Sequence, residues 1–268
     1  MLLIVTCLLS STLSAQSYRI LLSNDDGIES PLLMALHDQL AALPGVEVVV
    51  SAPDVNQSGS SQSTIGSVTV DRYFRDGEFF GYAVHGRPAD AVRFAVVELA
   101  GDSGFDLVVS GINRGANVGD VSHGSGTVGA AMEAIYHGIP ALAVSQETEN
   151  VDTEASAKFA SAIVARYQRD GAPQGTVVSI NIPGGELKGV AIRPMGGSYL
   201  KTESYEPSDQ IGNTTNYERI RIRVPVDSPE TDTYAFQQGY ITITPLKFDW
   251  TDHELLNEIE SWDLKLID

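Results

Sequence analysis

The sequence predicts an α/β protein with a mostly parallel sheet, followed by a smaller β-rich region. Short apolar runs, typical of strands buried on both faces, alternate with helical patterns as far as residue 183. Several of these runs end directly in loops of Gly, Ser, Asn and Asp. Beyond Gly184 the helical patterns thin out and short strands are separated by polar stretches, which indicates a second, β-rich part.

Composition limits the classes of function. The 268 residues suffice for one large α/β domain or two small ones, and 43% of them are hydrophobic, as in a folded globular protein. A formal charge of −18 disfavours duplex nucleic acid as a partner. Cys7 is the single cysteine, so an intrachain disulfide or a cysteine zinc site is excluded. No apolar run is long enough to span a bilayer.

The first 17 residues resemble a secretory signal peptide. Leu2 to Leu9 is mostly apolar, and Ala15 follows as a cleavage position. No Lys or Arg precedes the apolar run, so a strand extended at its start or a misassigned start codon remain alternatives. A cleaved signal predicts an exported protein, periplasmic or secreted, and the alternatives predict a cytoplasmic one.

A strand–turn–helix unit opens the folded part. Residues 20–22 are apolar and predict a short buried strand, and a helix pattern begins at Pro31. Between them lie Asp25 and Asp26, at the carboxyl end of the strand, where open α/β sheets bind ligands. An ordinary surface turn explains Asp-Asp-Gly equally well when it is taken alone.

The next segments predict a second strand, a loop and a hairpin. Residues 46–50 form an apolar run, and the hydroxyl-rich loop 56–64 follows. This loop is either a flexible linker or a functional loop at the same sheet edge as Asp25. Residues 68–70 and 79–84 predict a hairpin away from the parallel core, and a helix begins at Pro88.

Two further loops carry candidate site residues. The strand 105–109 runs into a glycine-rich loop with Asn113 and Asn117, which either bind a ligand or adopt left-handed turn conformations. Residues 124–127 precede a helix at 128–136 and form its amino-terminal cap, where free amides and hydroxyls can bind an anion. The small residues 129–131 predict close packing of this helix on the sheet. Capping alone would also explain Ser125.

The remaining chain completes the sheet and adds an arm. Strands are expected at residues 139–144, 177–182, 190–192, 220–224 and 240–244, and a helix at 154–168. Residues 201–217 lack an apolar run and predict an exposed arm. Leu255, Leu256, Ile259 and Trp262 fit one face of a carboxyl-terminal helix.

Together these loops predict a metal site. Carboxylates, hydroxyls and Asn side chains, without a His or Cys cluster, suit Mg²⁺ or Mn²⁺ rather than zinc. A divalent cation beside an anion-binding helix terminus is suited to phosphoester hydrolysis.

These motifs resemble the SurE family of survival proteins, which are metal-dependent nucleotidases and acid phosphatases. The resemblance runs from about Arg19 to Thr251. It rests on the segments 20–27, 52–59, 86–90, 110–117, 125–131 and 239–246. The sequence departs from the family pattern at Arg87, Ala91 and Gly124, where Thr, Cys and Tyr are usual, and Gly124 borders the predicted phosphate loop.

The resemblance implies a Rossmann-like three-layer fold and a β-rich region that helps to form dimers or tetramers. It also implies that one divalent cation is held by Asp25, Asp26, Ser58 and Asn113, and that the substrates are nucleoside monophosphates. We therefore expect residues 18–251 to form the phosphatase domain, with an arm region at about 184–251 and a terminal helix in 252–268. Most members of the family are described as cytoplasmic.

The predicted reaction uses a metal-bound water as nucleophile. Asp25 or Asp26 is the candidate base, and the predicted substrate contacts are Asn117, Ser125, Gly126 and Thr127. A rival enzyme mechanism makes Asp25 or Asp26 a nucleophile that forms an aspartyl phosphate. A non-enzyme rival is a receiver-like sensor module that binds phosphate or nucleotide without turnover.

Overall fold

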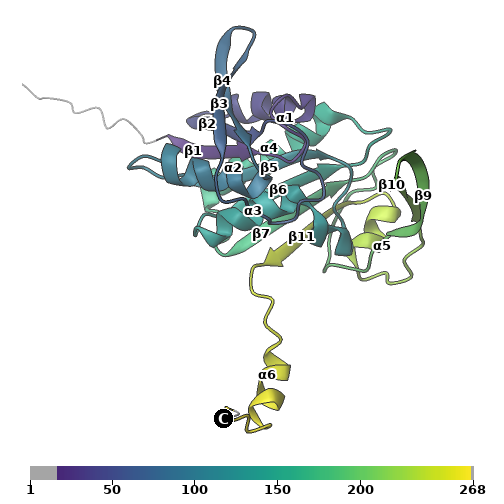
Figure 1. The fold of residues 1–268 in the computed structure, drawn as a ribbon. Coiled ribbons are helices and arrows are strands. Elements are labelled where there is room, and N and C mark those ends of the chain that lie inside the picture. Colours follow the sequence, from purple (N-terminus) through teal and green to yellow (C-terminus); the bar gives the residue numbers. More distant parts are fainter. Residues whose placement is uncertain (1–16, 267–268) are drawn as a thin grey trace, which may run out of the picture.

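The computed structural model describes residues 17–266 and confirms the three-layer α/β architecture (Figure 1). A nine-stranded sheet lies between two helical layers. Helices α1 (Pro31–Ala41) and α4 (Thr153–Asp170) pack together on one face, and α2 (Pro88–Phe94) and α3 (Gly126–Tyr136) pack on the other. The predicted signal peptide, except for Ser17, lies outside the described residues. None of the helices within residues 17–266 is long and apolar enough to cross a membrane.

The sheet is parallel through its middle and mixed at its edges. Its strands, in spatial order, are β3 (Thr69–Arg75), β4 (Glu78–His85), β2 (Val46–Pro53), β1 (Tyr18–Ser23), β5 (Leu107–Arg114), β6 (Ala141–Gln146), β7 (Thr176–Ile182), β11 (Ile241–Lys247) and β8 (Val190–Ile192). The six strands from β4 to β7 in this spatial order, which include β2 and β1, run parallel to one another. At the edges, β3 is antiparallel to β4, and β11 is antiparallel to β7. The carboxyl ends of the parallel strands therefore share one edge.

Strand β1 shows why the apolar runs are continuous. Ile20 and Leu22 are buried in the core under α1 and α4, and Leu21 is buried in the core under α2 and α3. Successive strand residues point to opposite faces, so a strand covered on both sides needs apolar residues at every position.

The prediction that residues 68–84 form a hairpin away from the parallel core is wrong in one respect. The hairpin β3–β4 exists, but Ser51 to Pro53 of β2 pair in parallel with Tyr82 to Val84 of β4. The end of β4 thus joins the main sheet at its edge, and the rest of the hairpin projects from it (Figure 1). The alternating pattern identifies the two strands but cannot identify their distant partner.

The β-rich part divides between the sheet and an exposed arm. β8 and β11 join the sheet, while β9 (Leu200–Ile211) and β10 (Thr214–Arg223) pair only with each other as an antiparallel hairpin. β9 falls in the segment predicted as an exposed arm. Most of its residues are exposed on both faces, so hydrophobic periodicity could not identify it as a strand. The short helix α5 (Asp232–Gln237) also lacked a sequence signal.

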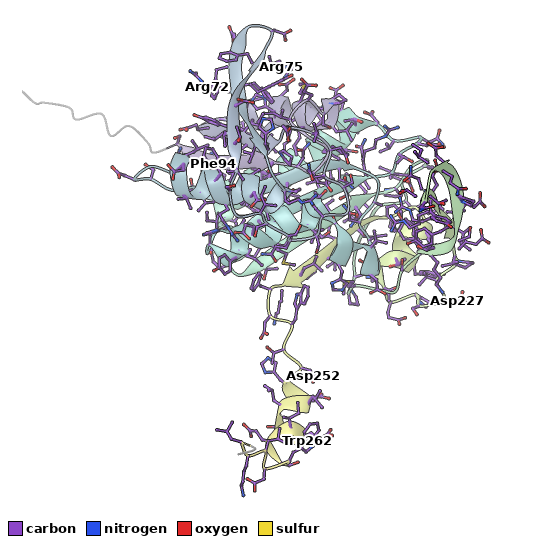
Figure 2. The ribbon with its side chains drawn as sticks, viewed as in Figure 1. Arg72, Arg75, Phe94, Asp227, Asp252 and Trp262 are labelled. Atoms are coloured by element: carbon purple, nitrogen blue, oxygen red, sulfur yellow. The ribbon has the colours of Figure 1, made fainter. Side chains whose placement is uncertain are left out.

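The predicted carboxyl-terminal helix is shorter than expected. Helix α6 spans His253–Glu260, and Trp262 lies beyond its end. Leu255, Leu256 and Ile259 are exposed, and α6 stands away from the main body (Figures 1 and 2).

Short turns connect the larger elements on the α2 and α3 side. A π-helical turn, η1 (Ala95–Leu99), continues α2, and a 3₁₀-helix, η2 (Gly119–Gly124), leads into α3. In α3, Ala130 and Ala131 are fully buried, as the close-packing prediction required. Gly129 faces the hydroxyl-rich loop instead of the sheet, because a Cβ there would lie 2.1 Å from the carbonyl oxygen of Ser61.

Replacing Gly129 with Ala should therefore push this loop off α3. We expect Gly129→Ala to lower the free energy of unfolding by about 1–3 kcal/mol, as overpacking does, despite the better helix propensity of Ala. Gly124→Ala is the matched control, since a Cβ at Gly124 meets nothing within 4 Å. Urea unfolding of both variants tests this, and a Gly129→Ala protein as stable as the control would contradict the packing.

Candidate metal and phosphate site

The turn after β1 is closed by the side chain of Asn24. Its Nδ2 donates to the carbonyl oxygen of Gly27 at 2.8 Å, and the Gly27 amide donates back to its Oδ1 at 3.2 Å. This Asx-type arrangement satisfies the turn within a buried environment and leaves the side chains of Asp25 and Asp26 free for other partners.

Asp25 lies against the amino terminus of α3. Its side chain is buried, and its Oδ1 accepts a 2.6 Å hydrogen bond from the hydroxyl of Thr127. A Cβ at Gly126 would lie 2.9 Å from the Asp25 Cβ, so only glycine permits this approach. Burial raises the pKa of Asp25 from its ordinary 3.8 to about 6, the Thr127 bond opposes the shift, and the charge of Asp26 adds to it.

Asp26 joins two other segments to the same turn. Its Oδ2 accepts from the backbone amide of Arg114 at 2.8 Å, and its Oδ1 accepts from the side chain of Asn56 at 3.0 Å. Burial raises the pKa of Asp26 as well, although these bonds and the Arg114 charge oppose the shift. The two adjacent carboxylates are thus both held in surroundings that disfavour their negative charge.

Asn113 presents an oxygen to the site. Its Nδ2 donates to the carbonyl oxygen of Gly115 at 2.6 Å. Its Oδ1 accepts no hydrogen bond from any group within residues 17–266 and can therefore bind a ligand. The sequence placed Asn113 in a loop, but β5 continues to Arg114 after an irregularity in its pairing with β6 between Ser110 and Asn113. That irregularity interrupts the alternation of side chains between the two faces of β5, so the sequence cannot predict to which side Asn113 points.

Most of the predicted site residues line one cavity of about 610 Å³ at the carboxyl edge of the sheet. Asp25, Ser58, Asn113, Asn117 and Ser125 are all on its wall, so the four loops converge as the sequence predicts. Asp26, Gly126 and Thr127 are not on that wall. The Thr127 hydroxyl is occupied by Asp25 rather than directed into the cavity.

Ser125 combines two positions of interest. Its Oγ accepts from the Val128 amide at 3.1 Å and so caps α3, as the capping interpretation expected. The same residue lies on the cavity wall, where its hydroxyl can donate to a ligand. Asn117 is held by two hydrogen bonds: its backbone amide donates to the Oδ1 of Asn181, and its side-chain Nδ2 donates to the Oγ of Ser145. Both residues are therefore positioned before any ligand binds.

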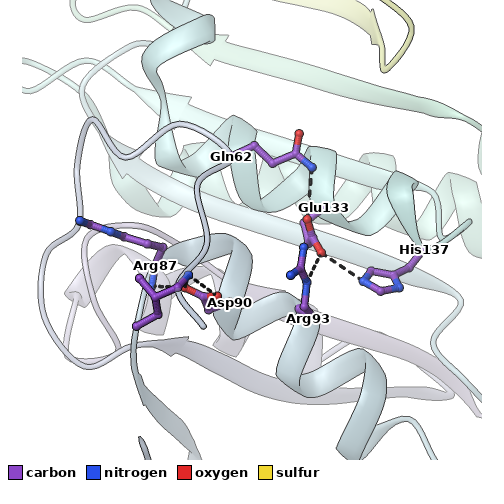
Figure 3. A network of polar contacts seen from close by, with 7 residues as sticks. Gln62, Arg87, Asp90, Arg93, Glu133 and His137 are labelled. Carbon is purple, nitrogen blue, oxygen red and sulfur yellow. Dashed lines mark hydrogen bonds and ion pairs between the residues drawn. The ribbon is translucent and has the colours of Figure 1, made fainter. Parts of the chain in front are cut away.

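A network of charged and polar groups fixes the hydroxyl-rich loop 56–64 (Figure 3). Gln62 donates to the buried carboxylate of Glu133 on α3 at 3.2 Å, and Arg93 of α2 contacts the same carboxylate at 2.8 Å. Just beyond the loop, the amide of Ile65 donates to Asp90 at 3.1 Å. The loop is therefore attached to both helices of that layer, and the flexible-linker alternative is not supported.

The donor set fits a hard divalent cation. The candidate ligands Asp25, Asp26, Ser58 and Asn113 offer only oxygen atoms, and two of them are adjacent carboxylates with raised pKa values that a cation would favour in their charged form. Within the described residues, no three His, Cys, Asp or Glu side chains form a metal cluster. The chemistry of these donors suits Mg²⁺ or Mn²⁺ better than zinc.

Sequence reasoning missed a set of arginines. Arg114 and the arm residues Arg219, Arg221 and Arg223 also line the cavity. The signal was present in the motif Arg-Ile-Arg-Ile-Arg, whose period of two puts all three arginines on one face of a strand. What could not be read from the pattern is that β10 turns this face toward the cavity.

Comparison with known proteins identifies close relatives. The profile of the family described as "Survival protein SurE" matches residues 20–202. The "5'-nucleotidase SurE" of Chlorobaculum tepidum is 37% identical over 260 residues, covering 95% of this chain and 98% of the relative. That of Vibrio parahaemolyticus is 35% identical, covering 94% and 96%. The crystal structure of the SurE protein from Aquifex aeolicus has a TM-score of 0.77 at 32% identity, covering 92% of this chain and 100% of that one.

Removing the charge of Asp25 should stabilise the metal-free protein. Because the folded pKa of about 6 exceeds the ordinary 3.8, the wild type loses stability as pH rises through this window. We expect Asp25→Asn to gain on the order of 1–3 kcal/mol over wild type at pH 7.5 and little at pH 4. Chemical unfolding in the presence of a chelator measures this difference.

The exposed Asp102→Asn is the control and should change stability little at either pH. Added Mg²⁺ or Mn²⁺ should stabilise only the wild type and so make it more stable than Asp25→Asn. If Asp25→Asn is less stable than wild type at pH 7.5 in chelator, the conclusion that the buried charge of Asp25 destabilises the metal-free protein is wrong.

Proposed function

Since the chain belongs to the SurE family of survival proteins, we propose that it is a divalent-metal-dependent phosphomonoesterase. It would hydrolyse nucleoside 5′- and 3′-monophosphates to nucleoside and phosphate. The observation that carries the proposal is the buried carboxylate of Asp25 packed against the amino terminus of α3. This contact brings a cation-binding group and an anion-binding helix end to the same cavity.

Asp25, Asp26, Ser58 and Asn113 would hold one Mg²⁺ or Mn²⁺. Bound there, the cation supplies Lewis-acid chemistry, which polarises a phosphoryl oxygen and makes a water more acidic. Asp25 or Asp26 is the candidate base that would accept the proton of the attacking water. Thr127 keeps the Asp25 carboxylate in one orientation through its hydroxyl.

The amino terminus of α3 would bind the phosphate. The Ser125 hydroxyl and the backbone amide of Gly126 lie at the first turn, where amides lack partners within the helix. The backbone amide of Thr127, like its hydroxyl, bonds Asp25 instead. The Ser125 and Gly126 donors can stabilise the charge that spreads over the phosphoryl oxygens during the reaction. Asn117, held by Asn181 and Ser145, is positioned to contact the substrate from the opposite loop.

The receiver-like sensor alternative is not supported. The relatives with the full length of this chain carry the name of a nucleotidase, and the β-rich part beyond Gly184 belongs to the same fold as the SurE protein of Aquifex aeolicus. The aspartyl-phosphate mechanism stays a rival, which borohydride trapping of an acyl phosphate would reveal.

Assembly and location are further parts of the proposal. We propose a homodimer or homotetramer to which the arm region at 184–251 contributes, because Tyr205, Ile211 and Tyr217 expose large apolar side chains on the β9–β10 hairpin. We also propose that residues 1–17 are a signal peptide and that the mature protein is exported.

The division of labour between metal and phosphate groups can be tested with two variants. In a phosphate-release assay over nucleotides and metals, Ser125→Ala should lower kcat/KM roughly ten- to a hundredfold, because one hydrogen bond to a charged group contributes about 1.5–3 kcal/mol. Calorimetric titration should show nearly unchanged metal affinity in Ser125→Ala and a large loss in Asn113→Ala.

Because Ser125 also caps α3, Asp152→Ala provides the control. Asp152 caps α4 by accepting from the Ala155 amide and lies off the cavity wall, so this variant should lose similar stability but keep its activity. If Ser125→Ala lost metal binding as severely as Asn113→Ala, the assignment of separate metal and phosphate groups would be wrong. A wild-type protein that releases no phosphate from any nucleotide would disprove the proposed function.

Export can be tested by amino-terminal sequencing of the protein purified from its native host. We expect the mature chain to begin near Gln16, because cleavage after Ala15 follows the apolar run. An intact Met1 or Leu2 would show that the segment is retained.

A further inference from the structure

The arm presents a row of cations to the cavity. Arg219, Arg221 and Arg223 alternate along β10, and all three lie on the cavity wall. Thr202 of β9, directly opposite Arg221 in the antiparallel register, lies on the same wall. Figure 1 shows this hairpin in green beside the main sheet. The row is therefore part of the cavity and not merely a charged outer surface.

Most of this positive charge is not neutralised by the protein. Arg223 forms an ion pair with Glu147 at 2.8 Å. Within residues 17–266, no carboxylate oxygen lies within 4.0 Å of a side-chain nitrogen of Arg114, Arg219 or Arg221. In a chain with a formal charge of −18, the unpaired guanidinium groups of Arg219 and Arg221 on one cavity wall require an explanation, whereas the charge of Arg114 acts on Asp26.

Arg223 contacts the fold through Glu147 and the ring of Tyr199, whereas Arg219 and Arg221 form no ion pair within the described residues. Their side chains are exposed, and the apolar residues of β10, Ile220 and Ile222, lie on the opposite side of the strand. Salt bridges and packing therefore do not account for Arg219 and Arg221. Guanidinium groups bind phosphate through paired, parallel hydrogen bonds, which makes a phosphate the best-matched occupant.

In the proposed function the scissile phosphate is bound by the cation at Asp25 and Asn113 and by the first turn of α3, and none of these groups belongs to the arm. A volume of about 610 Å³ falls within the range for small-molecule sites and leaves room for a whole nucleotide. The arm arginines must then face a different part of the substrate.

We propose that Arg219 and Arg221, with Thr202 opposite Arg221, form a second phosphate subsite that makes nucleotides with two phosphate groups, such as nucleoside 3′,5′-bisphosphates, the preferred substrates. The proposal rests on the proposed phosphomonoesterase function. The reaction is unchanged: a water oxygen bonds to one phosphorus, the ester P–O bond breaks, and the leaving ribose oxygen takes a proton. The second phosphate stays on the product.

The test compares one nucleoside as its 5′-monophosphate, its 3′-monophosphate and its 3′,5′-bisphosphate. Wild type should hydrolyse the bisphosphate with a kcat/KM at least tenfold above that of either monophosphate. The double variant Arg219→Ala/Arg221→Ala should reduce this ratio to about one. The preference of wild type should also weaken as salt is added, because the contact is between exposed charges. Identification of the product shows which of the two phosphates is released.

Lys201→Ala is the matched control. Lys201 lies opposite Ile222 in the register, so it belongs to the face of the hairpin that turns away from the arginines, and it is not on the cavity wall. Its removal subtracts one positive charge from the same arm and should leave the preference at the wild-type value. A loss of preference equal to that of the arginine variant would point to net charge alone and overturn the subsite.

Two further outcomes would also overturn it: a wild type without preference for the bisphosphate, or an arginine variant with altered mass in light scattering and equal losses on all three substrates. The second would mean that the arginines hold an assembly together. Calorimetric binding of the bisphosphate to wild type and to the arginine variant needs no turnover. Weaker binding by the variant supports the subsite even if no nucleotide is hydrolysed, so failure of the proposed function is distinguished from failure of this inference.

Discussion

The contact between Asp25 and the first turn of α3 is the constraint on which the rest of the site depends. Thr127 donates to the buried carboxylate, and the missing Cβ of Gly126 allows the helix to come close enough for it to do so. Burial of a carboxylate without a cationic partner is unfavourable, as the raised pKa of Asp25 shows. The protein tolerates this arrangement because the same geometry would place a metal cation beside a helix amino terminus.

A second close contact, between α3 and the loop 56–64, fixes the part of the cavity wall that this loop forms. The loop 56–64 crosses α3 at Gly129 and is attached to Glu133 through Gln62, while Asp90 holds its far end at Ile65. Loops that carry ligands need a rigid support, since a displaced oxygen no longer completes a coordination shell. Here the support comes from α3, the helix that we propose binds the phosphate, so one element would position both the metal-binding and the anion-binding groups.

Charge is distributed unevenly over the molecule. The chain as a whole is strongly acidic, yet four arginines line the proposed substrate cavity, three of them from a single strand. A nucleotide gains little from the net field of such a protein and depends on local cations within the cavity. In our proposal the arm is part of the substrate site as well as a surface for assembly.

The sequence by itself determined the α/β class, most strands and helices, and the four loops that form the site. These follow from local patterns: the apolar run at 20–22 followed by Asp25 and Asp26, and the Gly/Ser/Thr cap before α3. Only the tertiary structure decided that β4 joins β2, that the Thr127 hydroxyl serves Asp25 and not the cavity, and that β10 turns its arginines inward. Each of these depends on groups far apart in the chain, and hydrophobic periodicity reports which face of an element is buried but not what lies against it.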